Sequence, residues 1–168
     1  MAFITEEILD KTLDKVAALD EEQINDSLAD FFSKQPFIMT YIMGTTEAMN
    51  SDEAKNDLVF LLLVTLECFY SFQDSIVMIE EEQIENAERA QVELMTKFDN
   101  TTDQTEQLEL ALSFVSSQVH LFEYISEIVE PNGEDDSTNF DDDDSGAAFG
   151  SLKIIADLLT AATEESEA

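Results

Sequence analysis

Three side chains could carry chemistry in this chain: Glu67, Cys68 and His120. Glu67 interrupts the most apolar stretch, and a carboxyl group buried there would have a raised pKa suited to proton transfer or metal binding. Cys68 is the only cysteine and His120 the only histidine, so the fold could pair them as nucleophile and base. We favour a Glu67 side chain that faces solvent. We also favour a structural role for His120, because Ser117 stands three residues before it, at the position where a di-iron helical bundle has Glu.

A run of aspartates near the C-terminus could bind a cation. Asp141, Asp143 and Ser145 match the opening of a calcium-binding loop. The twelfth position of such a loop would be Leu152, so the bidentate Glu is missing. We expect these three residues to bind Ca²⁺ or Mg²⁺ weakly and opportunistically at most. The better interpretation is a solvated acidic loop over residues 134–145, whose aspartates could be replaced without loss of the helical core.

No motif in the sequence identifies an enzyme. A phosphate-binding loop, a dinucleotide-binding glycine pattern, a His-Glu-x-x-His motif and a nucleophile elbow are all missing. Carboxylates are so numerous that their spacing cannot single out a catalytic pair. We therefore expect no catalytic residues and no cofactor-binding residues, and a protein that is not an enzyme.

The net charge limits the classes of partner. With 7 Lys and Arg against 39 Asp and Glu, the formal net charge is −32. Such a field repels nucleic acids and anionic lipid surfaces, which are polyanions themselves. It favours basic proteins and metal cations. The acid is spread along the chain, with 18 of the 39 acidic residues in 1–84, so neither half is an acidic domain by itself.

The sequence also favours a cytoplasmic location. A single cysteine cannot form an intramolecular disulfide, which argues against a disulfide-stabilised secreted module. The N-terminal residues lack the basic region of a signal peptide. The longest apolar run, Leu58–Leu66, is much shorter than the roughly 20 residues that cross a bilayer. We therefore expect no membrane contact.

The elements that must position these residues are helices. The chain has only 4 Gly and 2 Pro with 44% hydrophobic residues, which favours long helices around a real core. Apolar residues recur at helical spacing, and Thr5, Asp20 and Ser51 are suited to cap helices. The fold class is therefore all-α, a compact bundle of about seven to eight helices. The expected helices are 5–19, 20–35, 37–43, 51–72, 79–98, 104–117, 119–129 and 146–163.

Two stretches of the sequence resemble each other, Gln35–Ile42 and Gln118–Ile125. Each begins with Gln and ends with Tyr-Ile, follows an amphipathic helix, and precedes an acidic loop and an apolar helix. This order predicts an internal duplication of a four-helix unit. Tyr41 and Tyr124 could then be a repeated ligand-facing element, although buried tyrosines bonded to a neighbouring helix are the favoured interpretation. The single domain 1–168 would contain repeat one, about 4–76, and repeat two, about 79–163.

These observations predict a non-enzymatic, acidic helical protein that acts as a protein-interaction or regulatory module with a basic partner. One alternative is acidity of the kind found in proteins of salty cytoplasm, where it serves solubility. Another is a weak divalent-cation binder that uses the acidic loop. Apolar residues such as Met39 and Phe69 could line the core or a seam between two copies, so a homo-oligomer is compatible with the sequence.

Overall fold

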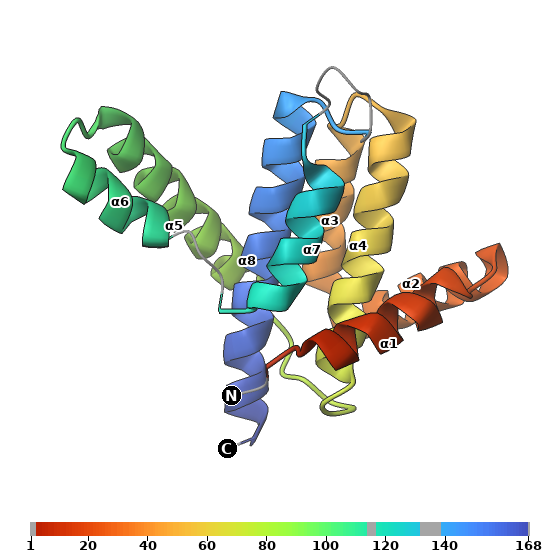
Figure 1. The fold of residues 1–168 in the computed structure, drawn as a ribbon. Coiled ribbons are helices and arrows are strands. Elements are labelled where there is room, and N and C mark those ends of the chain that lie inside the picture. Colours follow the sequence, from red (N-terminus) through yellow and green to blue (C-terminus); the bar gives the residue numbers. More distant parts are fainter. Residues whose placement is uncertain (1–2, 114–116, 132–138, 168) are drawn as a thin grey trace.

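The computed structural model describes residues 3–113, 117–131 and 139–167, and their regular structure is entirely helical, as predicted. Eight α-helices connected by short segments account for most of these residues (Figure 1). They are α1 (Glu6–Ala17), α2 (Glu21–Lys34), α3 (Pro36–Glu47), α4 (Asp52–Tyr70), α5 (Glu81–Asn100), α6 (Gln104–Ser113), α7 (Val119–Val129) and α8 (Asp142–Glu167).

Local capping residues set the helix starts. The hydroxyl groups of Thr5 and Ser51 accept hydrogen bonds from backbone N–H groups in the first turns of α1 and α4. Asp20 and Gln23 form a reciprocal capping box at the start of α2. These three predicted caps are confirmed. A further capping box at Glu80 begins α5 and was not predicted.

Helices α3 and α8 differ in their boundaries from the sequence prediction. Helix α3 continues through Gly44, where a glycine in a helix interior weakens the helix but does not break it. Helix α8 begins at Asp142, inside the expected acidic loop 134–145, because the Asp141 carboxylate accepts a hydrogen bond from the Asp144 N–H and so caps the helix. The rest of that expected loop lies mostly in 132–138, outside the described residues.

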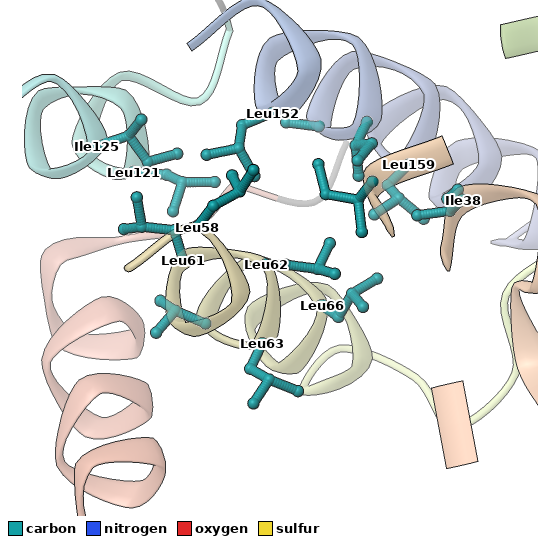
Figure 2. Packing of buried hydrophobic residues seen from close by; sticks show 14 of the residues in the cluster. Ile38, Leu58, Leu61, Leu62, Leu63, Leu66, Leu121, Ile125, Leu152 and Leu159 are labelled. Atoms are coloured by element: carbon teal, nitrogen blue, oxygen red, sulfur yellow. The ribbon is translucent and has the colours of Figure 1, made fainter. Parts of the chain in front are cut away.

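The core lies between α3, α4, α7 and α8, which stand side by side in Figure 1. Helix α4 is buried on nearly all sides, as its continuous apolar sequence predicts. Figure 2 shows Leu58 of α4 directed toward Leu121 of α7, while Leu66 is directed toward Leu159 of α8. Burial of these side chains away from water is the main stabilising contribution to the fold.

Two helical hairpins extend from this bundle in different directions (Figure 1). The α1–α2 hairpin is held against it, since α1 packs on α4 and α2 packs on α3 and α4. In the α5–α6 hairpin, α5 packs on α8 and α3, whereas α6 packs on α5. The second hairpin is therefore an arm, named here the α5–α6 arm, that reaches away from the core.

The helix contacts are reciprocal between the two predicted repeats. Helix α1 contacts α7 of the other repeat, and α5 contacts α3 of the other repeat. Helix α4 packs against α7 and α8, and α3 also packs against α8. Each first helix also packs within its own predicted repeat, α1 on α4 and α5 on α6 and α8. The duplication and the repeat boundaries remain predictions.

Helix α8 is the one helix within the described ranges that has the length and hydropathy of a membrane-spanning helix. Its best window has a mean hydropathy of 1.2, and 56% of that window is buried inside the protein. Soluble proteins often place such a helix in the core. We assign α8 to the core of the bundle because it packs on α3, α4, α5 and α7.

Candidate functional site

Glu67, Cys68 and His120 contact three different places along α1. The Glu67 carboxylate forms an ion pair with Lys15, with Nζ and Oε2 2.6 Å apart. Cys68 is fully buried and hydrogen-bonded to the Thr12 side chain; burial raises the pKa of its thiol to about 11. The Nδ1 atom of His120 lies 3.7 Å from Oε1 of Glu6.

These contacts do not bring the three side chains into one site. Glu6 and Lys15 are separated by roughly 13 Å along the axis of α1, at 1.5 Å per residue. The small cavity beside Glu67 is lined by Lys11, Thr12, Lys15, Glu67, Tyr70 and Ser71, and so contains neither Cys68 nor His120. Across the described residues, no three His, Cys, Asp or Glu side chains are grouped as a metal site would need. An active site built from Glu67, Cys68 and His120 is therefore not formed.

The candidate cation ligands lie at the start of α8. Asp141 is the capping residue, and Asp143 and Ser145 belong to the first turn of the helix. The second carboxylate oxygen of Asp141 accepts a hydrogen bond from the Asn50 side chain at 3.1 Å. These hydrogen bonds lower the pKa of Asp141, with the bond from the Asp144 backbone contributing most. Cation binding by Asp141, Asp143 and Ser145 remains a prediction.

Asp144 changes one expectation about this segment. Its side chain is buried, and both carboxylate oxygens accept hydrogen bonds from the Asn50 backbone N–H, at 3.4 and 3.2 Å. Replacement of Asp144 would therefore weaken the attachment of the α3–α4 connection to α8. Asp141, Asp142 and Asp143 are exposed and Asp144 is buried. That the helical core tolerates replacement of all four aspartates remains a prediction.

Gln35 and Gln118 join the two repeats reciprocally. Both side chains are fully buried. Gln35 Oε1 accepts a hydrogen bond of 2.9 Å from the backbone N–H of Ile79, just before α5. Gln118 Oε1 accepts one of 3.0 Å from the backbone N–H of Ile4, just before α1. The recurring glutamines found in the sequence are thus structural connections between the two predicted repeats.

The recurring tyrosines are also engaged within the protein. Tyr41 is hydrogen-bonded to Glu88 of α5, and burial followed by the negative charge of Glu88 raises the pKa of Tyr41 to about 12. Partial burial raises the pKa of Tyr124, and the negative charges of Asp57 and Glu127 raise it further. Tyr41 therefore fits the interpretation of a tyrosine bonded to a neighbouring helix.

A groove that the sequence did not reveal lies between α5 and α8. Its volume is about 360 Å³. The Gly150 Cα faces Gln91, so that a Cβ atom there would lie 2.8 Å from the Gln91 Nε2; this lets the helices approach closely at that point. At Gly146 a Cβ atom would meet open space. The lining residues are Gln91, Met95, Phe98, Asp99, Gly146, Phe149, Gly150 and Lys153.

The α5–α6 arm also exposes large apolar side chains. Val92 and Met95 of α5 are 61% and 51% exposed, and Leu108 and Leu112 of α6 are 61% and 62% exposed. Met95 belongs both to this exposed set and to the lining of the groove. The groove therefore shares Met95 with the exposed apolar side chains of the arm. Met95 was expected from the sequence to face inward with the apolar stripe of its helix, and its exposure corrects that expectation.

Comparisons with protein-family models, with curated proteins and with solved structures gave no match for this chain. Its charge, its exposed apolar residues and the groove are therefore the observations that bear on its function.

Proposed function

We propose that the protein is a non-enzymatic, cytoplasmic interaction module that binds a basic protein partner. The observation that carries this proposal is the exposure of Val92, Met95, Leu108 and Leu112 on an arm of a chain with a net charge of −32. Apolar side chains gathered on one projecting element are typical of a surface that another protein covers. The surrounding acid would select partners of opposite charge.

The two features have separate roles in such an interaction. Long-range attraction by the acidic field increases the association rate of a basic protein and disfavours acidic competitors. Burial of apolar side chains then supplies most of the binding free energy, about 25 cal/mol for each Å² removed from water. Salt should weaken the first contribution and leave the second largely intact.

The proposal is tested by a pull-down from the native cell with the full chain as bait, at about 50 mM and about 500 mM KCl. We expect a basic protein to be retained at low salt and largely released at high salt. The double variant Leu108→Ser/Leu112→Ser should retain less of it at both concentrations. The proposal fails if no basic protein is retained, or if retention is the same for the variant and at both salt concentrations.

A second candidate function is acidity that serves solubility in a salty cytoplasm. It is favoured by the spread of acid over helices far from the groove, such as α1 and α2, whose first turns carry Glu6, Glu7, Glu21 and Glu22. In that case the free energy of unfolding should keep rising in molar KCl, well beyond the range in which simple screening saturates. Urea unfolding in increasing KCl, without any partner, separates the two candidates.

A further inference from the structure

We infer that the groove between α5 and α8 receives one amphipathic α-helix of the partner, with its apolar face in the groove and its Lys and Arg residues at the end marked by Gly146. This inference rests on the proposed function and names the partner's recognition element. It follows from the shape of the groove, from the apolar surface that continues it, and from the charge at its two ends.

The shape of the groove suits a helix face. Met95 and Phe98 of α5 form one wall, and Phe149 of α8 forms the other. Gly146 and Gly150 lie on one face of α8, four residues apart; the Gln91 side chain lies against Gly150, so Gly146 provides the open part of the floor. The volume of about 360 Å³ is near the lower limit for pockets that enclose small ligands. A few apolar side chains of a helix laid along an open groove fit it better.

The wall of the groove is firmly held. The Phe149 ring packs edge-on against Phe122 of α7, with centroids 5.5 Å apart. Tyr41 of α3 bonds to Glu88, which fixes the first half of α5 on the bundle. The Phe149 side of the groove is therefore formed before a partner arrives, which lowers the entropic cost of binding.

The apolar surface extends beyond the groove along α5. Val92 and Met95 are three residues apart, and Asp99 follows four residues later, so all three lie on one face of the helix. Val92 and Met95 are more than half exposed. A partner helix in the groove would cover both side chains, and this would account for apolar residues kept in contact with water.

Charge sets the direction of the partner helix. At the Gly146 end, Asp99 lines the groove, and Asp142 and Asp143 precede Gly146 by one helical turn on the same face of α8. At the other end the cation is Lys153, already paired with Asp157 at 2.8 Å. Asp99 therefore lies at this end of the groove, and Asp142 and Asp143 lie one helical turn before Gly146. This complementarity selects a helix whose basic residues are gathered at one end.

Two matched glycine variants test the groove. Gly146→Leu places a side chain in the groove, and Gly44→Leu makes the same change in α3, outside the groove lining. A Cβ atom meets open space at both positions, so both variants should fold, which circular dichroism would verify. The probe is a synthetic helix of Leu, Ala and Lys, about 18 residues long so that it is helical in water, with Lys confined to one end. A peptide with Glu in place of Lys is its control.

Calorimetric titration of the full-length protein gives the dissociation constants. We expect Gly146→Leu to weaken binding of the Lys peptide by about tenfold or more, which is the effect of losing about 1.4 kcal/mol, and Gly44→Leu to leave it unchanged. The double variant Asp142→Asn/Asp143→Asn should weaken binding and reduce its salt dependence, and the Glu peptide should bind far more weakly. Equal binding of the Lys peptide to Gly146→Leu and wild type overturns the inference.

Two further outcomes separate this inference from the proposed function. If Gly146→Leu still retains the basic protein in the pull-down, the proposed function stands and the groove is not its site. If wild type forms a dimer in sedimentation experiments and Gly146→Leu does not, the groove is occupied by a second copy of this chain and the inference is wrong.

Discussion

Replacing either buried glutamine by alanine should strongly destabilise the protein. Gln35→Ala removes the acceptor of the buried Ile79 N–H and the donor to the Val77 carbonyl and the Tyr70 hydroxyl, at 3.1 and 3.3 Å. An unsatisfied buried N–H costs about 1–3 kcal/mol and each further lost hydrogen bond about 1 kcal/mol. The free energy of unfolding should therefore fall by about 4 kcal/mol.

The equivalent change in the second predicted repeat should have an effect of similar size. Gln118→Ala removes the acceptor of the Ile4 N–H and the 3.1 Å bond to the Thr160 hydroxyl. We expect a loss of about 3 kcal/mol. Both losses are large beside the 5–15 kcal/mol that separates folded and unfolded states in a typical domain.

Urea denaturation followed by circular dichroism, at one fixed KCl concentration, measures these changes. With a slope of about 2 kcal/mol per molar urea, Gln35→Ala should lower the midpoint by about 2 M. The exposed Gln104 provides a matched control, and Gln104→Ala should change stability by less than about 0.5 kcal/mol. A loss below about 1 kcal/mol for both buried glutamines would refute the conclusion that they connect the repeats.

Three further changes test the energetics of the fold. Burial raises the pKa of the Cys68 thiol from 9.0 to about 11, so the unfolded chain loses this proton at a lower pH than the folded protein, and the free energy of unfolding falls as the pH rises through that range. Between pH 8 and pH 10.5, the fall measured by urea denaturation should be about 2 kcal/mol greater in wild type than in Cys68→Ala. Lys15→Met breaks the partly exposed ion pair with Glu67 and should cost at most about 1 kcal/mol in urea unfolding, an effect that molar KCl should reduce; a larger, salt-independent loss would contradict a screened ion pair. Gly44→Ala, in a helix with open space around the new Cβ, should raise the free energy of unfolding by about 0.5–1 kcal/mol and so raise the urea midpoint. A lowered midpoint would mean that the space beside Gly44 in α3 is occupied.

Helix starts were predictable from the sequence because their determinants are local. Thr5 and Ser51 cap their helices through hydroxyl groups that reach only as far as the first turn. The start of α8 was missed because a run of aspartates resembles a solvated loop, yet Asp141 caps a helix whose positive end favours the acid that follows. Composition described the segment correctly as acidic but could not show that it is helical.

The groove could not be predicted, because it depends on where two distant helices cross. Gly146 and Gly150 suggest a close helix approach only if another helix is known to pass there, and Gln91 of α5 is the side chain that does so. The separation of Glu67, Cys68 and His120 is also a tertiary property, since each contacts a different part of α1. The recurrence of Gln35 and Gln118 was visible in the sequence, but their partners, Ile79 and Ile4, were not.

The reciprocal glutamine bonds bear on how such a chain could have arisen. Gln35 accepts a hydrogen bond from the Ile79 N–H, and Gln118 accepts one from the Ile4 N–H. Each predicted half of the chain thus supplies a buried hydrogen-bond acceptor to the other half. A half-length chain could form the same bonds only with a second half-length chain.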